Sequence, residues 1–371
     1  MILDLFAGPG GWDMGARILG LAEPIHGVDI DVDACDTART AGFHRTQGNV
    51  TDLEPDSLRG ATDAIISPPC PTFSASGKRT GLNDLQHILE AIGQLGDSQA
   101  GLGPDDAWAD VYVRVQDVRS ALVVEAVRFA LRLPHLQRLV CEQVPGVTPI
   151  WQEMCAELAT AHDFTACNVL TLHGEDFGLP SRRTRTFVIA TRNQTPDLDG
   201  LPFREGWTCG RYAAPANLTP GTRARFPQTT MASALGYPAG ERINTRGNRR
   251  TSGGNEFSAD GLSWCLTEKA RSWKRVSNGA PLTASQAGLL TGFPADYPWQ
   301  GSRSKQFLQA ADVVSPPVAA AVLGTALGID WETPVRDYLA AIYGGDYSRE
   351  EILLAASACT STQLDLFAEV A

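Results

Sequence analysis

Short apolar runs alternate with segments of helical periodicity through the first half of this 371-residue chain. Four runs have the length and composition of buried strands: residues 2–6, 24–31, 62–66 and 136–141. Between them, residues 14–21 and 117–133 repeat apolar side chains at the spacing of a helix that packs on one face. Strands that alternate with helices predict an α/β fold, with its chemistry at the carboxyl ends of the strands.

The alternation stops in the middle of the chain. Residues 193–278 are rich in Gly, Pro, Asn and Arg, which indicates a separate small domain or elaborate loops. Helical patterns return over 282–294 and 317–327. We therefore predict four parts: a first catalytic segment over 1–192, an inserted small domain over 193–278, a return segment over 279–330 and an acidic tail over 331–371.

Glycine and polar residues lie at the ends of the first two predicted strands and at a further likely strand end in residues 47–52. Gly8, Gly10 and Gly11 form a turn in which the backbone can approach a ligand closely. Asp29 ends the next strand at about the 20-residue spacing where ribose hydroxyls find a carboxylate. Asn49 could accept a hydrogen bond from an adenine amino group. A tight strand-to-helix connection that binds no ligand is the alternative.

Cys70 lies between prolines in the loop 67–74, directly after the strand 62–66. Each proline removes an N–H donor and fixes φ, so the loop should be stiff and non-helical. Such a loop can hold a nucleophilic thiol in one place. The alternative is a small buried hydrophobic residue, which is what most free cysteines are.

Charged residues also end the later strands. Glu142 would face the same crevice as Cys70, or it could be a helix cap or a surface charge. Arg183 and Arg185 share one face of a strand by their period of two. Two guanidinium groups on one face can clamp an anion or the carbonyl of a base, although a solvated basic edge strand has the same pattern.

Charge is unevenly distributed along the chain. The formal net charge is -11, which argues against a protein that coats nucleic acid non-specifically. Residues 204–275, however, contain ten Arg and two Lys against five acidic residues, or +7, so the remainder carries -18. A basic segment inside an acidic chain is typical of localised nucleic-acid contact.

Cysteine spacing and hydropathy limit the setting of the protein. The eight cysteines include no CxxC pair, which argues against a zinc site and against a disulfide framework. No run of about 18 uncharged apolar residues is present, and the chain begins with Met-Ile-Leu-Asp. We therefore expect a cytoplasmic protein that is neither secreted nor bound to a membrane.

The ordered set of motifs resembles the DNA (cytosine-5) methyltransferases of bacteria and phages, over nearly the whole chain from Asp4 to Gly324. The motifs that carry the resemblance are DLFAGPGG at 4–11, Asp29, Asn49-Val50, PPCPTFS at 68–74, Asp117 with Arg119, EQV at 142–144, Arg183 with Arg185, LTASQAGLLTGFP at 282–294 and a closing motif around Asp312. The resemblance implies a Rossmann-like class I methyltransferase sheet with an inserted target-recognition domain, and S-adenosylmethionine as the cofactor.

The resemblance also implies the chemistry. The Cys70 thiolate would attack C6 of a flipped-out cytosine, which makes C5 nucleophilic enough to accept the methyl group. Glu142 would hold the N3 and N4 edge of the base, while Arg185, supported by Arg183, would position its O2 side. Loss of the C5 proton and elimination of Cys70 would release 5-methylcytosine.

Binding residues follow from the same resemblance. The expected cofactor residues are Asp4, Phe6, Ala7, Gly8, Gly10, Gly11, Asp29, Ile30, Asn49, Val50, Pro69, Asp312 and Val313. The expected DNA-binding residues are Ser74, Lys78, Arg79, Arg246, Arg249 and Arg250. No metal is expected.

Three positions depart from the family pattern. Gln143 and Ser181 stand where the family has Asn and Gln, and both could alter how nearby loops are positioned. Asp312 replaces a cofactor-side Asn. A carboxylate there should favour the cationic methionine end of S-adenosylmethionine and repel a carboxylated cofactor.

Near its end the chain contains Gln363, Leu364, Leu366 and Phe367 in the sequence QLDLF. This matches the pentapeptide by which bacterial replication proteins dock on the sliding clamp, and an apolar tail packed on its own domain is the alternative. We expect a monomer that acts on duplex DNA, with a restriction endonuclease as a possible further partner. A methyltransferase of RNA and an inactive DNA-binding regulator are the competing functions.

Overall fold

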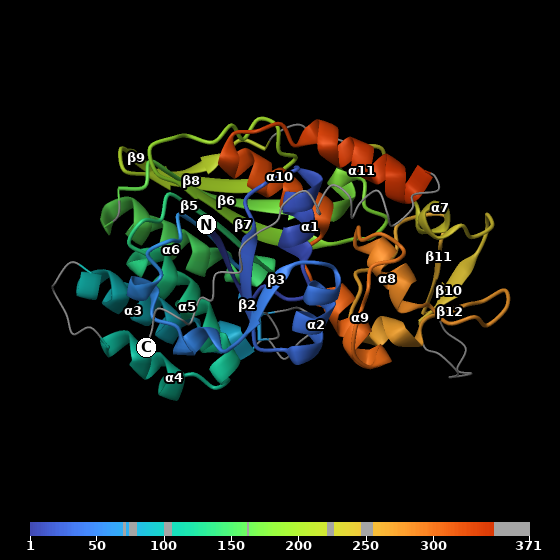
Figure 1. Cartoon of the computed structure of the whole chain (residues 1–371), viewed down its shortest axis with the longest axis horizontal. Helices are drawn as coiled ribbons and strands as arrows, with labels where there is room; N and C mark the ends of the chain where they lie inside the picture. Colours follow the sequence, from blue (N-terminus) through green and yellow to red (C-terminus); the bar gives the residue numbers. More distant parts are fainter. Residues whose placement is uncertain are drawn as a thin grey trace.

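The computed structural model of the protein describes residues 1–69, 72–73, 80–99, 106–161, 163–220, 226–245 and 255–344. A large mixed sheet forms its centre, with strand order β3-β2-β1-β4-β5-β7-β6-β8-β9 (Figure 1). Its strands are β1 (Ile2–Leu5), β2 (Ile25–Asp29), β3 (His44–Gln47), β4 (Asp63–Ile66), β5 (Arg138–Gln143), β6 (Ala166–His173), β7 (Thr184–Thr191), β8 (Glu205–Gly210) and β9 (Ala213–Leu218). The half from β3 to β5 is parallel and the half from β7 to β9 is antiparallel.

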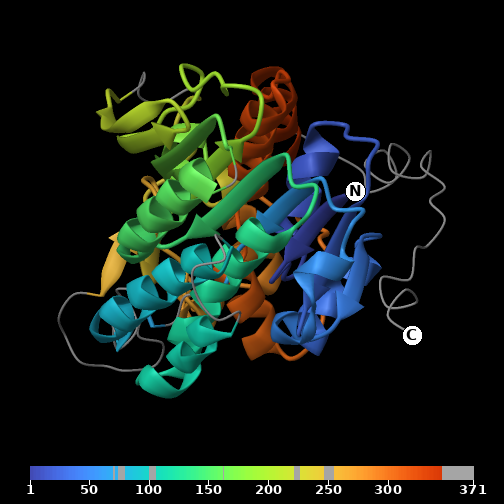
Figure 2. The ribbon, with the colours of Figure 1, turned by 90° about the vertical axis from the view of Figure 1, so that its left-hand side faces the viewer.

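Helices cover both faces of this sheet. They are α1 (Gly11–Ile18), α2 (Val32–Thr40), α3 (Thr80–Gln99), α4 (Val111–Arg114), α5 (Val118–Arg132), α6 (Thr148–Ala161), α7 (Met231–Leu235), α8 (Ala284–Leu290), α9 (Arg303–Asp312), α10 (Pro316–Leu327) and α11 (Glu332–Gly344). One face packs against α3, α5 and α6, and the other against α1, α10 and α11 (Figures 1 and 2). The predicted α/β class with a Rossmann-like sheet is confirmed.

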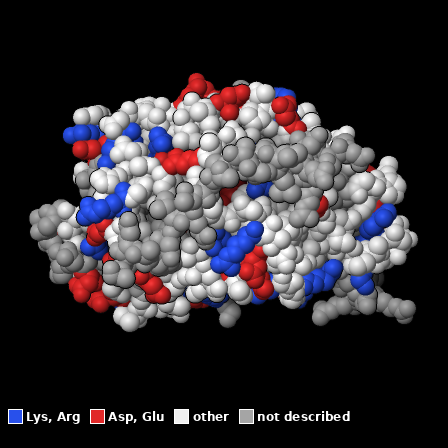
Figure 3. Space-filling model, in the orientation of Figure 1, with Lys and Arg blue, Asp and Glu red and all other residues white. Residues whose placement is uncertain are grey.

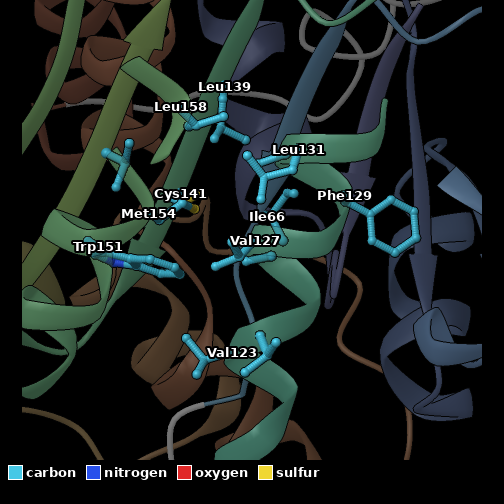
Figure 4. Packing of buried hydrophobic residues seen from close by; sticks show 14 of the residues in the cluster. Ile66, Val123, Val127, Phe129, Leu131, Leu139, Cys141, Trp151, Met154 and Leu158 are labelled. Atoms are coloured by element: carbon cyan, nitrogen blue, oxygen red, sulfur yellow. The ribbon is translucent and has the colours of Figure 1, made fainter. Parts of the chain in front are cut away.

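The core beneath the carboxyl ends of β4 and β5 is built by α5. Asp117 caps this helix by accepting a hydrogen bond from Arg119 N (3.0 Å), after which apolar residues recur at helical spacing. Figure 4 shows Val123 and Val127 of α5 in the same cluster as Cys141 of β5. All three are buried, so the ends of these strands rest on a rigid base.

The antiparallel half of the sheet was not foreseen in its extent. Residues 205–218 lie in the segment predicted as an inserted domain, yet β8 pairs with β6 and extends the large sheet. The separate small sheet consists of β10 (Arg242–Asn244), β11 (Glu256–Ser258) and β12 (Lys274–Arg275). We call residues 226–245 and 255–283 the small-sheet module.

The small-sheet module shares a core with the rest of the chain. Ile243, Phe257 and Trp273 of the module are buried in one cluster with Phe293 and with Met14 of α1. Figure 1 shows the module at one end of the large sheet, next to α8 and α9. The module is therefore an extension of the body of the protein.

Two further segments differ from simple expectation. Residues 332–344, predicted as the start of an acidic tail, form α11, whose Val335 and Leu339 are buried against α10. Residues 303–327 form a stretch long and apolar enough to cross a membrane, but 89% of its most apolar window is buried inside the protein. That stretch is two core helices, α9 and α10.

Candidate active site

The loop that contains Cys70 is anchored where it leaves β4. Ser67 Oγ accepts a hydrogen bond from Trp12 Nε1 of α1 (2.9 Å), and Ser67 N donates to Leu5 O of β1 (3.2 Å). Cys70 itself, with Pro71, lies outside the described residues. The structure therefore describes the frame of the predicted nucleophile rather than its thiol.

The loop is anchored again beyond Cys70. Phe73 is buried, and a Cβ on Gly146 would lie only 3.0 Å from its carbonyl oxygen. Thr72 O accepts a hydrogen bond from Gly81 N at the start of α3 (3.0 Å). Residues 72–73 are thus held against the body of the protein by close contact with Gly81 and Gly146.

Gln143 connects the end of β5 to this loop. Its Nε2 donates to Pro68 O (2.6 Å) and its Oε1 accepts from Val144 N (2.5 Å), and the side chain is buried. The sequence marked Gln143 only as a departure from the family pattern. The structure gives it a function, because it fixes the main chain two residues before Cys70.

Glu142 and Arg185 face each other across the paired strands β5 and β7. Arg185 Nε lies 3.0 Å from Glu142 Oε1, and both side chains are largely buried. Burial raises the pKa of the Glu142 carboxyl, while the nearby Arg185 and Arg183 guanidinium groups oppose that rise. Glu142 is thus the buried strand-end carboxylate that the sequence predicted, and neither a surface charge nor a helix cap.

Arg183 makes different contacts from Arg185. Its guanidinium donates to three carbonyl oxygens at the end of α9: Ala311 O (2.5 Å), Asp312 O (3.1 Å) and Val313 O (2.5 Å). These carbonyls have no partner within the helix, so a buried cation there satisfies them and opposes the negative end of the helix dipole. Arg183 therefore connects the region of Glu142 and Arg185 to the closing motif.

Asp312 lies where the two sides meet. Its side chain is exposed, yet surrounding protein atoms raise the pKa of its carboxyl, as expected on the wall of a crevice. Arg183 and Arg185 oppose this rise. Asp312 and Glu142 therefore belong to one charged cluster together with the two arginines.

The glycine-rich turn has the shape of a ligand cradle. Phe6, Gly8 and Gly10 have φ values of 60°, 55° and 108°, in the left-handed region that favours glycine. A Cβ on Gly11 would lie 2.3 Å from Val314 O, so only glycine allows α1 to start against the closing motif. This turn fits the close backbone approach that a nucleoside cofactor needs.

The return segment supports the glycine-rich turn from behind. Tyr297 OH donates to Pro9 O (2.5 Å), and a Cβ on Gly10 would lie 2.7 Å from that hydroxyl oxygen. Tyr297 is buried with Trp299 and Phe293 in a cluster of aromatic rings. Sequence analysis missed Tyr297, although it lies only a few positions beyond the LTASQAGLLTGFP motif, which ends at residue 294.

Asp29 connects the cradle to the second strand. Its Oδ2 accepts from Gly8 N (2.8 Å) and its Oδ1 from Asp31 N (2.8 Å). Burial raises the pKa of the Asp29 carboxyl, and these two amides oppose the rise. The next residue, Ile30, is 67% exposed, an unusual position for an apolar side chain unless a ligand covers it.

Asn49 and Val50 lie at the end of the third strand. Asn49 Nδ2 donates to Thr51 Oγ1 (2.5 Å), and the residue caps the short helix η1 (Val50–Asp52). Val50 is buried in the core, so its side chain supports this segment and only its main chain can face a ligand.

The remaining residues expected at the cofactor differ in exposure. Pro69 is exposed, Phe6 and Gly8 are half-buried, and Ala7, Gly10, Gly11 and Val313 are buried. Asp4 is fully buried within β1, and neither carboxylate oxygen has a hydrogen-bond partner among the described residues. Burial raises its pKa well above the usual range. Asp4 can therefore influence a cofactor only through the turn above it.

A short backbone bridge joins the small-sheet module to the segment before Arg183. Ser263 N donates to Pro180 O (2.8 Å) and Ser263 O accepts from Arg182 N (3.1 Å). Ser181 Oγ donates to Leu290 O of α8 (2.6 Å), so this departure from the family pattern ties the strand before Arg183 to the return segment.

The expected DNA contacts lie outside the described residues. These are Ser74, Lys78, Arg79, Arg246, Arg249 and Arg250, and the same is true of the predicted clamp-binding residues Gln363, Leu364, Leu366 and Phe367. Figure 3 shows basic and acidic side chains interspersed on one face of the described part of the molecule. The described part also holds no group of three His, Cys, Asp or Glu side chains suited to a metal ion.

Comparison with known proteins agrees with this geometry. The sequence model of the family "C-5 cytosine-specific DNA methylase" matches residues 1–91. Type II methyltransferase M1.HphI of Haemophilus parahaemolyticus is 25% identical over 353 residues, which is 88% of this chain and 86% of that protein. Type II methyltransferase M.AquIA of Picosynechococcus sp. is 25% identical over 266 residues, covering 66% of this chain and 96% of that one.

Solved structures share the fold at low sequence identity. The methyltransferase EhMeth of Entamoeba histolytica is 12% identical with a TM-score of 0.57, over 88% of this chain and 97% of that chain. The Dnmt2 methyltransferase of S. pombe is 13% identical with a TM-score of 0.54, over 88% and 98%. The family match and these relatives support assignment of the chain to the DNA cytosine-5 methyltransferases, whose reaction is methyl transfer to cytosine in DNA.

Proposed function

We propose that this enzyme methylates C5 of a flipped-out cytosine in duplex DNA at one specific short sequence, with S-adenosylmethionine as donor, through a covalent bond between Cys70 and C6. The observation that carries the proposal is the buried pair of Glu142 and Arg185, whose Oε1 and Nε lie 3.0 Å apart. Glu142 lies near the end of β5, and the next residue, Gln143, binds the main chain of the loop that contains Cys70. The glycine cradle lies at the same edge of the sheet.

Cys70 supplies the nucleophile. Its thiolate adds to C6 of cytosine, which moves electron density to C5. Once C5 carries the methyl group, a base removes the C5 proton. The S–C6 bond then breaks, which restores the ring and the thiolate. The prolines on either side of Cys70 in the sequence should limit where its sulfur can lie relative to the base.

Glu142 and its two arginines control the other edge of the base. A carboxyl whose pKa is raised can hold a proton at N3 and accept a hydrogen bond from the N4 amino group. Arg185 orients Glu142 and approaches the O2 side of the ring. Arg183 acts as a positioning residue, because both of its Nη groups donate to the end of α9.

The cofactor side fits S-adenosylmethionine, which supplies an electrophilic methyl group on a cationic sulfonium. Phe6 and Ile30 would pack against the adenine, Asp29 would accept from the ribose hydroxyls and Asn49 would face the adenine edge. Asp312 would lie toward the methionine end, where its carboxylate favours a cation.

Base flipping explains why such a site is concave and buried. A base within a duplex presents neither face to a protein, so the enzyme must unstack it at a cost of about a few kcal/mol. The arginine-rich residues of the small-sheet module and residues 246–250 would supply phosphate and base-edge contacts that offset this cost.

The test is transfer of labelled methyl from S-adenosylmethionine to duplex DNA, followed by base-resolution sequencing of the product. We expect label on cytosine C5 at one recurring motif, and none with Cys70→Ser. Label on RNA instead of DNA would indicate the RNA enzyme. Specific binding of DNA without transfer would indicate an inactive regulator.

The QLDLF sequence supports a second, separate proposal. Gln363, Leu364, Leu366 and Phe367 offer apolar anchors for a groove on a bacterial sliding clamp. Capture of the purified clamp by the full chain, lost with Leu366→Ala and Phe367→Ala and retained with Glu369→Ala, is the expected result. We further propose that the protein is cytoplasmic and monomeric, and sedimentation tests the monomeric state. A restriction endonuclease of the same site specificity is the further partner that we propose.

A further inference from the structure

A buried arginine lies under the proposed cofactor cradle, and no motif pointed to it. Arg45 belongs to β3, and its side chain is fully buried. Its Nη2 donates to Asp13 Oδ2 of α1 (2.7 Å) and lies 3.4 Å from Ala7 O in the glycine-rich turn. The guanidinium therefore reaches from an outer strand to the turn that follows β1.

The Arg45 side chain can cross β2 because residue 27 is a glycine. Gly27 of β2 is the partner of Arg45 in the sheet register. A Cβ at position 27 would lie 1.3 Å from Arg45 Nη1, so any side chain there would displace the guanidinium. The pair of Gly27 and Arg45 lets a cation cross one strand inside the sheet.

The surrounding charges are mostly acidic. Asp4 of β1, Asp13 of α1 and Asp29 of β2 all interact electrostatically with Arg45. Asp31 and the Cys35 thiol also lie near Asp29, and Asp31 is paired with Lys305. Arg45 is thus the one buried guanidinium that these three acids share among the described residues.

Two of these interactions, one electrostatic and one a hydrogen bond, bear directly on cofactor binding. Arg45 is the largest side-chain influence that favours the ionised form of Asp29. Its approach to Ala7 O also steadies the main chain between Phe6 and Gly8, where φ turns positive. If Arg45 and Asp13 formed only an ordinary buried ion pair, the pair would stabilise the fold alone, and removing either partner would have the same effect.

We propose that Arg45 is a positioning residue for the cofactor: its buried guanidinium holds the glycine-rich turn in place and supplies positive charge close to Asp29, without itself touching the ligand. This inference rests on the proposed function, in which Asp29 accepts from the ribose hydroxyls. The charge of Arg45 matters in this account, and its bond to Asp13 matters less.

The experiment measures binding of S-adenosylhomocysteine by calorimetry between pH 6 and pH 9. Arg45→Met should weaken binding about tenfold or more at pH 7, as loss of the charge that favours ionised Asp29 predicts. Removing Arg45 raises the Asp29 pKa further, so the deficit should shrink as the pH rises. Asp13→Asn keeps the guanidinium and should stay within about threefold of the unmodified protein.

Two matched variants separate charge from fold. Arg45→Lys keeps the cation and should recover most of the affinity. Arg138→Met removes an arginine that pairs with Asp63 at the opposite end of the strands, and should leave binding unchanged.

Several outcomes overturn the inference. One is equal loss in Arg45→Met and Asp13→Asn, and another is a loss independent of pH that follows thermal stability. If Arg45→Met does not fold, a loss of tenfold or more in Asp13→Asn has the same force, because that variant keeps the Arg45 guanidinium. Failure of the unmodified protein to bind S-adenosylhomocysteine would instead contradict the proposed function.

Discussion

The half of the site proposed to bind the cofactor and the half proposed to bind the base surround their central ionisable group with opposite kinds of side chain. On the cofactor half, Asp4, Asp13 and Asp29 surround the single guanidinium of Arg45. On the base half, Arg183 and Arg185 flank Glu142. The first arrangement suits a cationic sulfonium and the second suits negative charge that develops on a base after thiolate addition. Neighbouring strands of one sheet thus create two electrostatic environments.

The halves also differ in what shapes them. The cofactor half relies on main-chain geometry, with positive φ at three residues between Phe6 and Gly10 and close approach at Gly11. The base half relies on side chains that bridge elements, such as Gln143 to the Cys70 loop and Arg183 to α9. A change of one residue should therefore affect binding in the first half and rate in the second.

The largest effect should come from Glu142→Gln. An amide cannot supply a proton to N3 of the base as a carboxyl can, so we expect kcat to fall about 10²- to 10⁴-fold. S-adenosylhomocysteine affinity should change little, because Glu142 is on the base half. Single-turnover methylation measures the first quantity and calorimetry the second. Equal losses in both would break the division between the halves.

Asp29→Ala is the corresponding change on the cofactor half. It removes the acceptor for the ribose hydroxyls and the partner of Gly8 N, so KM for S-adenosylmethionine should rise about 10- to 100-fold. The value of kcat at saturation should change much less. Steady-state kinetics with Asp36→Ala, an exposed acid on α2, provides the control; a fall in kcat alone would contradict the assignment.

Gln143→Ala should have a smaller effect that sharpens the comparison. Loss of the bond to Pro68 O loosens the frame of Cys70 and leaves a buried carbonyl without its partner, at a cost of about 1–3 kcal/mol in stability. The rate of covalent trapping by 5-fluorocytosine DNA should drop about tenfold. Gln143→Glu keeps an acceptor for Val144 N but loses the donor, and should resemble Gln143→Ala.

Asp4→Asn should have the mildest effect, and it should depend on pH. Burial raises the Asp4 pKa, so the folded protein binds this proton more tightly than the unfolded chain does. The ionised carboxyl therefore costs stability above its unfolded pKa, and that cost disappears as the pH falls below it. Asp4→Asn should be more stable than the unmodified protein at pH 7, by about 1 kcal/mol, with no difference near pH 4. Urea unfolding at both pH values measures this.

Much of the site was predictable because its residues follow strand ends. Asp29 and Glu142 each close a short apolar run, and the register of parallel strands brings such ends to one edge. The period of two grouped Arg183 with Arg185, and both interact with Glu142, although Arg183 precedes β7 and does not share a strand face with Arg185. It could not show that Arg183 binds the end of α9, a contact between residues about 130 positions apart.

Other features were missed for physical reasons. The helices α3 and α6 were not predicted: glycines interrupt the pattern of α3, and the helical spacing of Ile150, Met154 and Leu158 in α6 was not recognised. Arg45 looked like an ordinary basic residue on a short polar strand. Its importance depends on the space left by Gly27, which exists only after the two strands pair.

The shared core of the small-sheet module bears on how new specificities could arise. Because Ile243, Phe257 and Trp273 are buried with Phe293 and Met14, a transplanted module would need its return segment as well. The large sheet continues to Leu218, so a viable crossover would fall near residue 226 and not near 193. Chimaeras, and the recombination events that shuffle such enzymes, should therefore exchange a longer unit than the variable sequence alone.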